Sequence, residues 1–390
     1  MSGATHDVIV IGAGPAGGVA AIELARQGRR VALIEKSPFP RRKVCGEFMS
    51  ASNAPVLRRL GIEADWEALA GPEVRRVALY AGESVIDAPM PARHGHGRAL
   101  GREVLDTLLR DVALARGAEI LQPCRAAAHA REDGLHVIEA HPEEGAPRRL
   151  AAPVLVAAHG SWERGELPTS LGKAGAPSDM LGFKAYFRGG AMPAGTMPLL
   201  AFPGGYGGMV WADRGRLSLS CCIRRDRLSA LREGRSARAA EAMEAHLLAS
   251  CRGVREALAG AEPDGSWLAT GPIRPGIRPR HAGGVFSVGN VAGEAHPVIA
   301  EGISMAIQSA SLMAQALSGL DLRDASAVEA AGRRYSAAWA RQFAPRIHAA
   351  RAIAALAMRP RVLELSVGAL PALLTFGASL SGKTKLTALR

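Results

Sequence analysis

The sequence is poor in aromatic residues, and it has no run of basic residues interleaved with aromatics. Phenylalanine, tyrosine and tryptophan make up 4% of the 390 residues. Lys and Arg outnumber Asp and Glu by 48 to 36, but without aromatics between them this excess does not predict nucleic-acid binding. The basic excess is either a general compositional bias or an attraction to an anionic partner, such as a phosphorylated cofactor, an acidic carrier protein or a membrane surface.

Cysteine is scarce and is not arranged for metal binding. The cysteines form no CxxC pair, so no metal site is expected; they are Cys45, Cys124, Cys221, Cys222 and Cys251. Their number is odd, and no secretory signal precedes the first predicted strand. We therefore expect reduced thiols in a cytoplasmic protein.

Long apolar runs are also lacking, with one exception near the C-terminal end. Residues 365–382 carry no charge, but Pro371 and several glycines interrupt them. The first interpretation is a helix docked on the protein. The second is peripheral membrane contact through residues 362–382, and a true membrane span comes third.

What the sequence does contain is a strand–turn–helix–strand pattern from Val8 to Lys36. Gly12, Gly14 and Gly17 form a GxGxxG motif, in which the first glycine permits a tight turn, the second admits a pyrophosphate and the third allows close packing. Glu35 ends the second strand, where an acid accepts hydrogen bonds from a ribose hydroxyl. The pattern predicts FAD or NAD rather than NADP.

Two later segments favour FAD, because a flavin nucleotide is long enough to need a second binding segment. Residues 287–310 repeat the strand, glycine turn and helix pattern, and Arg102 stands at a predicted helix start where it could reach the cofactor. The predicted cofactor-binding residues are Gly12, Gly14, Pro15, Ala16, Gly17, Glu35, Lys36, Cys45, Arg102, Gly289, Asn290, Pro297, Gly302 and Ile303.

The order of predicted elements indicates an α/β nucleotide-binding unit that is interrupted by a second, antiparallel layer. We expect the cofactor domain in residues 1–73, 99–160 and 271–323. Strands in residues 74–98 and the segment 161–270 would form the substrate domain, and residues 324–390 a helical C-terminal region.

The chain resembles the FAD-dependent oxidoreductases that include aromatic hydroxylases, flavin halogenases and geranylgeranyl reductases. Residues 10–35, 101–109 and 288–303 carry the resemblance, and the RRKVCGE segment at residues 41–47 places it nearest the geranylgeranyl reductase-like branch. The resemblance implies a discontinuous Rossmann-like FAD domain, an antiparallel substrate sheet, and NADH or NADPH as a transient reductant.

The chain departs from that pattern at two positions. Asn290 stands where the superfamily usually has Asp, so the hydrogen bonds are kept and the charge is lost. His159 replaces the Asp of the mid-chain Asp-Gly motif, which puts the mode of reduction by NAD(P)H in doubt. Tyr206 and a shifted Trp211 match only part of the branch's Tyr-x-Trp-x-Phe-Pro motif.

Several reactions fit an FAD protein of this kind. Hydroxylation of a biosynthetic intermediate by a monooxygenase is our first expectation, and reduction of a carbon–carbon double bond is the second. An electron-transfer or non-catalytic flavoprotein paired with a membrane partner is a further alternative. Halogenation is disfavoured, because the tryptophans never form a WxWxIP motif. The expected partner is a small molecule, either free or linked to a carrier or a lipid.

Three residues are candidates for catalysis: His296, Cys45 and Lys184. His296 follows the second glycine turn and could donate a proton, or it could simply bond to backbone. Cys45 could face the flavin, as the resemblance implies, or be a small buried apolar residue. Lys184 is the interior lysine that a halogenase would need, but a lysine in a strand more often faces solvent.

Overall fold

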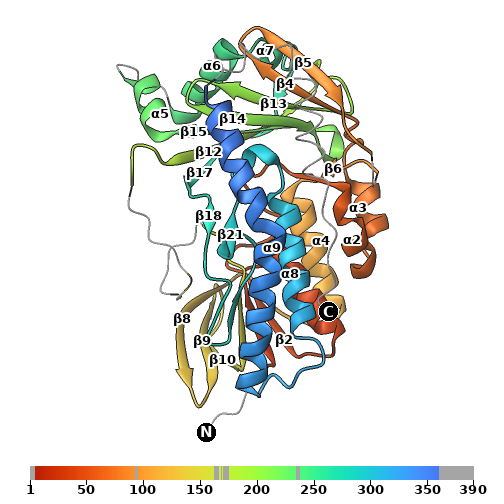
Figure 1. Cartoon of the computed structure of the whole chain (residues 1–390), viewed down its shortest axis with the longest axis vertical. Helices are drawn as coiled ribbons and strands as arrows, with labels where there is room; N and C mark the ends of the chain where they lie inside the picture. The colour runs from red at the N-terminus through yellow and green to blue at the C-terminus, as the bar shows by residue number, and fades with distance from the viewer. Residues whose placement is uncertain are drawn as a thin grey trace.

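The computed structural model describes residues 5–92, 95–161, 167, 169, 175–233 and 238–359. Figure 1 shows a large sheet at one end of the long axis and a small three-stranded sheet at the other. Long helices run along the side of the molecule between the two ends. The mixed α/β class with a helical C-terminal region, expected from the sequence, is confirmed.

A six-stranded sheet forms the centre of the nucleotide-binding part, in the order β19-β20-β11-β1-β2-β7. All neighbouring pairs are parallel except β19–β20. The inner strands are short, apolar and fully buried, as is usual for parallel sheets covered on both faces. The strands are β1 (Val8–Ile11), β2 (Val31–Ile34), β7 (Glu119–Leu121), β11 (Val154–Ala157), β19 (His281–Ala282) and β20 (Val285–Ser287).

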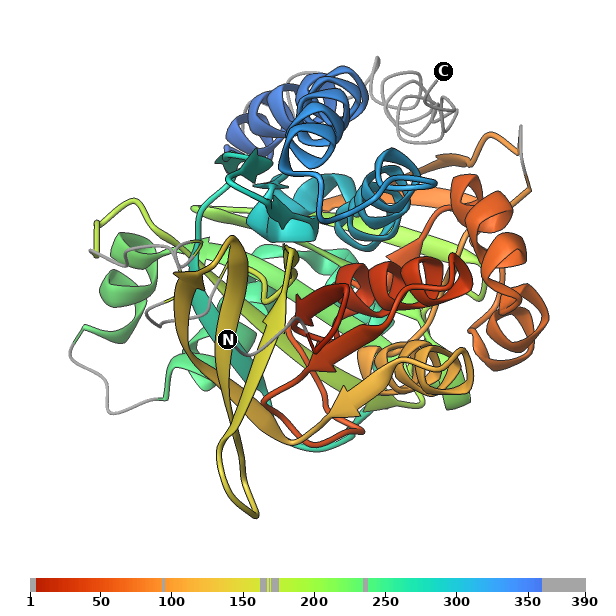
Figure 2. The same ribbon diagram turned by 90° about the horizontal axis from the view of Figure 1, so that it is seen from below.

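The two faces of this sheet are covered differently. Val8 and Val10 on β1 pack into the helical core, whereas Ile9 and Ile11 pack on a three-stranded sheet made of β8 (Cys124–Glu132), β9 (Leu135–Pro142) and β10 (Arg148–Ala152). On the helical face, α8 lies between α1 and α9, as Figure 2 shows. The helices are α1 (Pro15–Arg26), α4 (Arg102–Ala115), α8 (Gly302–Ala316) and α9 (Ala325–Ala357).

The large sheet belongs to the second layer, with the order β16-β12-β15-β14-β13-β4-β5 and β17 paired to β12. It is antiparallel apart from β13–β4, which is parallel. Its strands are β4 (Arg76–Ala81), β5 (Ser84–Pro89), β12 (Met180–Arg188), β13 (Thr196–Phe202), β14 (Gly205–Trp211), β15 (Leu217–Arg224), β16 (Glu262–Pro263) and β17 (Leu268–Ile273).

Three helices pack on the outer face of the large sheet: α5 (Arg225–Arg232), α6 (Ala239–Ser250) and α7 (Arg252–Ala257). The smaller elements are β3 (Phe48–Met49), paired with β6 (Arg98–Ala99), and β18 (Gly276–Ile277), paired with β21 (Gly293–Glu294). Short helices complete the fold: α2 (Ala54–Leu60), α3 (Glu63–Leu69), and the 3-10 turns Ala51–Asn53, Asp213–Gly215, Gly289–Val291 and Pro297–Ile299.

The apolar segment 362–382 lies outside the described residues. Of the helices that the structure describes, none is both long enough and apolar enough to cross a bilayer.

Candidate functional site

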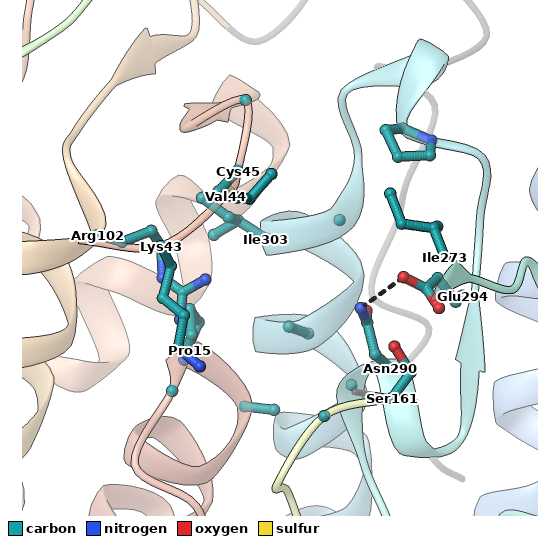
Figure 3. Close-up of a pocket in the computed structure, with 18 of the residues that line it drawn as sticks. Pro15, Lys43, Val44, Cys45, Arg102, Ser161, Ile273, Asn290, Glu294 and Ile303 are labelled. Carbon is teal, nitrogen blue, oxygen red and sulfur yellow. Dashed lines mark hydrogen bonds between the residues drawn. The ribbon is translucent and has the colours of Figure 1, made fainter. Parts of the chain in front are cut away.

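A cavity of about 680 Å³ lies between the parallel sheet and the large sheet. Both predicted glycine turns line it, as Figure 3 shows, with Pro15 and Arg102 on one side and Asn290 on the other. The predicted cofactor residues that line the cavity are Gly12, Gly14, Pro15, Ala16, Glu35, Lys36, Cys45, Arg102, Gly289, Asn290, Pro297, Gly302 and Ile303.

Gly17 is absent from the cavity lining that the structure describes, and it has a packing role instead. A Cβ on Gly17 would overlap the carbonyl oxygen of Gly12 and come within 3.1 Å of the Ala158 side chain. Gly12 itself has φ +99°, and a Cβ there would lie 2.7 Å from the Ala158 carbonyl oxygen. The turn therefore requires glycine at both positions, as the motif predicts.

Helix α1 opens toward the cavity with free backbone donors. In this turn, which the structure describes completely, no side chain caps the helix and the first turn has no acidic residue. A Cβ on Gly14 would approach the Arg102 guanidinium at 3.2 Å, so the glycine lets this cation lie close to the turn. Such a helix start, beside a cation, is suited to phosphate.

Glu35 is buried at the end of β2 and is bound from two sides. Its carboxylate accepts hydrogen bonds from the backbone N–H of Ala13 (2.9 Å) and of Ser37 (2.9 Å), and Arg41 pairs with it at 3.1 Å. Three donors leave part of the acceptor capacity of a carboxylate unused. Glu35 thus fixes the glycine turn and can still accept from a ribose hydroxyl.

Arg102 begins α4 and is held by Asp106, one turn further on. The guanidinium donates to both carboxylate oxygens at 2.7 Å. Burial would lower the pKa of Arg102, but the Asp106 carboxylate outweighs it and the pKa is raised. The cation is therefore permanent and oriented when it faces the cavity.

The second glycine turn meets the first directly. A Cβ on Gly289, which has φ +59°, would lie 2.9 Å from the Ala16 side chain. Asn290 donates to the Glu294 carboxylate at 3.1 Å, and burial raises the pKa of Glu294. Helix α8 begins at Gly302, where an added Cβ would meet nothing within 4 Å among the described residues.

The opposite wall of the cavity comes from β13, β14 and β15. Within the described part of these strands, every side chain that lines the cavity is uncharged. Because side chains alternate along a strand, every second residue faces the cavity. The cavity-facing residues of this sheet wall are Met197, Leu199, Tyr206, Val210, Ser220 and Cys222.

One polar pair stands in this apolar region. Tyr206 and His296 both line the cavity, and the Tyr206 hydroxyl lies 3.0 Å from His296 Nδ1. Burial raises the pKa of Tyr206 well above its usual value. Burial, together with the positive charge of Arg351, lowers the pKa of His296 to about 4. At neutral pH the pair is a phenol bonded to a neutral imidazole.

The other two catalytic candidates lie at different depths. Cys45 lines the cavity and is half-buried, and the backbone N–H of Glu47 donates to its sulfur at 3.4 Å. Lys184 is fully buried, so the alternative of a lysine facing solvent is wrong. It is not among the described residues that line the cavity. The catalytic assignments of Cys45, Lys184 and His296 stay predictions.

Comparison with known proteins now identifies the family. A family model described as an FAD binding domain matches residues 5–327. The chain belongs to the FAD binding domain family.

The curated relatives of this FAD-binding chain include reductases. A menaquinone reductase of Mycobacterium tuberculosis is 36% identical over 136 residues, which are 34% of this chain and 32% of the relative; the match thus spans about a third of that protein. A digeranylgeranylglycerophospholipid reductase of Methanopyrus kandleri is 28% identical over 354 residues, or 86% of this chain and 83% of the relative.

Solved structures show the same fold. A probable FAD-dependent monooxygenase from Pseudomonas aeruginosa is 21% identical, with a TM-score of 0.71 over 91% of this chain and 97% of the other. At this identity the likeness concerns the fold alone.

The residues present fit FAD. Arg41 lies beside Glu35, and its buried Nε and Nη1 atoms have no hydrogen-bond partner among the described residues, so two donors are available to an acceptor. The uncapped start of α1, with Arg102 beside Gly14, would take the pyrophosphate, and the Gly302 end would take the isoalloxazine end. Within the described ranges, no group of three or more His, Cys, Asp or Glu side chains could hold a metal ion.

Sequence reasoning missed Arg41, Glu47 and the sheet wall. Arg41 stands six residues after Glu35, and a basic residue so close to the ribose acid could have been a signal. Glu47 adopts φ +62°, which is uncommon for a residue other than glycine and leaves no trace in the sequence. Met197, Val210 and the other apolar residues of the sheet wall have the sequence pattern of ordinary core residues in a sheet.

Proposed function

We propose that the chain is an FAD-dependent reductase that saturates a carbon–carbon double bond in a neutral, apolar substrate of isoprenoid type. The observation that carries the proposal is the uncharged sheet wall of the cavity, which faces the two glycine turns across the site. An anionic group placed against this wall would find no cation on β13–β15, which is unfavourable because a buried charge needs a partner.

The relatives support this substrate class. The menaquinone reductase and the digeranylgeranylglycerophospholipid reductase are both named for lipid substrates with isoprenoid chains. The second relative matches over most of its own length as well as most of this chain, which is the condition under which a shared activity is most informative.

Bound FAD, once reduced, would supply the hydride for one carbon of the double bond. The chain's own residues have the other tasks. The Gly12–Gly14 turn and α1 bind the pyrophosphate, and Glu35 orients the ribose. The sheet wall packs against the apolar substrate and excludes water from the reacting carbons.

The Tyr206–His296 pair can hold the proton that the second carbon requires. Tyr206 stays protonated at neutral pH because burial raises its pKa, and His296 stays neutral because its pKa is about 4. A phenol that gives up its proton can recover it through the hydrogen-bonded imidazole. The overall balance is one hydride and one proton added, with NADH, NADPH or a separate reductase restoring the electrons.

The test is a single turnover without oxygen. The purified protein, loaded with FAD and reduced chemically under anaerobic conditions, is mixed with a polyprenyl lipid that carries double bonds. We expect the flavin to be reoxidised and the product to gain two hydrogen atoms by mass spectrometry. A product that forms only in air and contains a new oxygen atom would overturn the reductase proposal.

Hydroxylation of the same kind of substrate is the second candidate, and it is the reaction that the sequence alone favours. The uncharged wall supports it too, because an oxygen-dependent reaction also needs an apolar substrate kept away from water. Halogenation has less support, because Lys184 lies outside the described cavity lining.

Tyr206→Phe tests the proton role separately. We expect kcat to fall by about 100-fold with KM nearly unchanged, because only the proton donor is removed. Tyr80→Phe is the matched control, since Tyr80 is buried in the same sheet but does not line the described cavity. An equal loss in both variants would assign the effect to packing.

The remaining expectations extend the proposal. The substrate is a small molecule, either free or linked to a carrier or lipid, and residues 362–382 would provide peripheral contact with the membrane that holds it. The proposed setting is the cytoplasm at the membrane surface.

A further inference from the structure

A segment that lines the cofactor cavity, residues 42–47, rests along strand β12 of the large sheet. Residues 182, 184 and 186 of β12 face the same side, because side chains alternate along a strand. A Cβ on Gly182 would lie 3.2 Å from Val44, and Lys184 donates to the Cys45 carbonyl oxygen at 2.8 Å. The Arg42 guanidinium stacks 4.9 Å from the Tyr186 ring centre.

Glu47 and Lys184 form the central contact between the segment and the strand. Their charged atoms are 2.7 Å apart, and neither side chain is exposed to solvent. The Glu47 carboxylate also accepts from the backbone N–H of Arg102 at 3.1 Å and from the Tyr186 hydroxyl. These contacts hold Glu47 in its left-handed backbone conformation.

The ionisation of the pair follows from the same contacts. Burial would raise the pKa of Glu47, but Lys184, Tyr186 and the Arg102 amide outweigh it and hold the pKa below its usual value. Burial lowers the pKa of Lys184, and the Glu47 carboxylate opposes this effect. Lys184 is therefore the main cation that stabilises the Glu47 carboxylate in its buried position.

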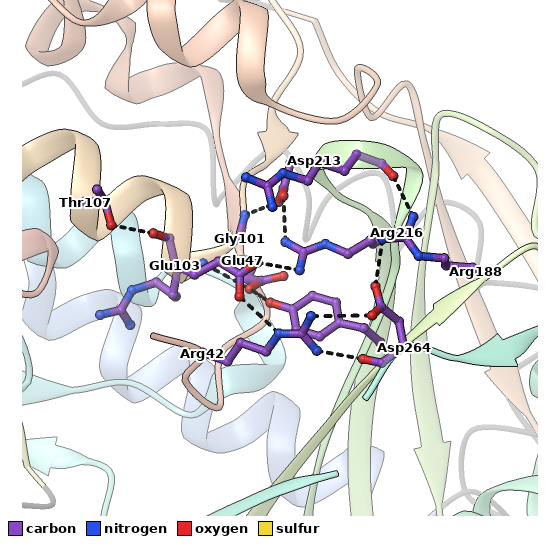
Figure 4. A network of polar contacts seen from close by, with 12 residues as sticks. Arg42, Glu47, Gly101, Glu103, Thr107, Arg188, Asp213, Arg216 and Asp264 are labelled. Carbon is purple, nitrogen blue, oxygen red and sulfur yellow. Dashed lines mark hydrogen bonds and ion pairs between the residues drawn. The ribbon is translucent and has the colours of Figure 1, made fainter. Parts of the chain in front are cut away.

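The surrounding network fixes the start of α4 on the same support, as Figure 4 shows. Arg216 pairs with Glu103 and with Asp213, both at 2.6 Å, and lies 4.4 Å from the Tyr186 ring centre. Asp213 accepts from the backbone N–H of Gly101 at 2.6 Å. Arg102 is therefore positioned from the sheet as well as by Asp106.

We propose that Lys184 is a positioning residue, which together with Glu47 fixes Cys45 and the Arg102 amide at the cavity and so couples the large sheet to the cofactor site. Cys45 and Glu47 line the cavity, whereas Lys184 stands behind them. The proposal rests on the proposed function only in taking FAD as the occupant of the cavity.

The physical reason is the cost of separating the pair. If residues 45–47 moved away from β12, two charges would be left buried without partners, which is strongly unfavourable. The segment therefore stays with the strand, and a displacement of β12 by a substrate on the sheet wall would be transmitted to Cys45. Lys184 acts here through Glu47 and the Cys45 carbonyl rather than on substrate.

The thiol of Cys45 provides a direct measurement. Iodoacetamide labelling of Cys45 is followed by peptide mass spectrometry in the full chain, with and without FAD. Two variants are compared with the parent. Lys184→Met removes only the cation, whereas Lys184→Met combined with Glu47→Gln removes both charges of the pair, so that neither is left unpaired. In the absence of FAD, we expect Cys45 of the double variant to be labelled about tenfold faster than Cys45 of the parent. With FAD bound, we expect the visible absorption band of the flavin in the double variant to be shifted relative to the parent. Tyr186→Phe, which removes one bond to Glu47, should give an intermediate rate.

Two controls separate positioning from general loosening. Arg59→Met removes a cation whose hydrogen bonds go to Glu23 and Ser311 rather than to the network around Glu47, so it should lower the melting temperature while Cys45 labelling stays within about twofold of the parent. Buried Cys251, which is not among the described residues that line the cavity, should remain unlabelled in every variant. Unchanged Cys45 labelling and an unshifted flavin band in the double variant would overturn the proposal, as would equal acceleration by Arg59→Met. Neither measurement uses a substrate, so a failure of the proposed reduction leaves the result intact.

Discussion

The two ends of the cavity are built in opposite ways. The nucleotide end is charged and tightly constrained, with Glu35, Arg41 and Arg102 around a turn that tolerates only glycine at position 12. The sheet end has no charged lining residue in the described part of β13–β15, and its one polar pair is Tyr206 with His296. The first end recognises a fixed chemical group, whereas the second offers an apolar surface that selects by shape.

This difference explains why the nucleotide end is easier to predict from the sequence than the sheet end. Specific polar recognition needs backbone and side chains held to within a fraction of an ångström, so substitutions there should abolish binding. An apolar wall accepts many arrangements of similar volume, so its substitutions should have graded effects. The following experiments test whether the two ends of the cavity differ in this way.

The largest effect is expected for Gly12→Ala. The new Cβ would lie 2.7 Å from the Ala158 backbone oxygen and would also be strained at φ +99°. We expect FAD affinity to fall by more than about 100-fold, measured by flavin fluorescence, because the turn must move out of its pyrophosphate-binding position. Binding of an apolar fluorescent probe at the sheet end should change little.

Gly28→Ala is the matched control for that variant. Gly28 has φ +77°, but an added Cβ would meet nothing within 4 Å among the described residues. It should lose about 1 kcal/mol of stability and keep its FAD. Equal loss of FAD from both variants would assign the effect to backbone strain.

A charge on the sheet wall should produce the next largest effect. In Leu199→Glu, a carboxylate would face the apolar substrate, and kcat/KM should fall by about 100-fold while FAD affinity stays within twofold. Leu114→Glu is the control, because Leu114 is 57% exposed on α4. Loss of FAD from the Leu199 variant would show that the two ends are not independent.

A smaller effect is expected when Glu35 is replaced by Ala. One ribose partner is removed, which typically costs about 1–3 kcal/mol, and the Ala13 amide also loses its acceptor. The dissociation constant of FAD should therefore rise by about 5- to 150-fold in equilibrium titration. Glu73→Ala, far from the cavity, provides the comparison; unchanged affinity in the Glu35 variant would reject the ribose role.

The smallest effect concerns acid stability at the sheet end. His296 has a folded-state pKa of about 4, below the unfolded value near 6.5, so the unfolded chain binds more protons between these values. The contribution of His296 to stability should therefore fall as the pH falls from about 6.5 toward 4, by about 1 kcal/mol at pH 5 after allowing for solvent screening.

Urea unfolding of His296→Gln between pH 7 and 5 checks this slope, which should be flatter in the variant. His348→Gln, at an exposed position of α9, should retain the parent's slope. A His296→Gln variant whose stability changes with pH in the same way as that of the parent would contradict the assignment.

Sequence reasoning recovers the nucleotide end because its residues are contiguous. The turn, α1 and Glu35 lie within a single stretch of chain, and each has a residue type that its local geometry demands. Strands β1 and β2 follow from the strand–turn–helix–strand pattern between Val8 and Lys36, because both are short apolar runs. The second turn was recognised because it repeats the same local pattern.

The remainder depends on contacts between distant segments. Strand β8 was missed because its alanines and exposed charges show no clear alternation, and α5 and α7 are too short for a periodic signal. Lys184 was expected to face solvent more often than not, and only the pairing of β12 with a loop more than a hundred residues earlier shows what it contacts. Tyr206 and His296 are 90 residues apart and meet only through the fold.

The order of strands along the chain has a consequence for synthesis. Residues 8–34 supply β1 and β2 of the parallel sheet, residues 76–89 supply β4 and β5 of the large sheet, and the chain then returns with β7 and β11. Strand β20, which borders β11, arrives only at residue 285. A ribosome must therefore make about 70% of the protein before either sheet is complete, and the nascent chain will expose unpaired strand edges for most of its synthesis.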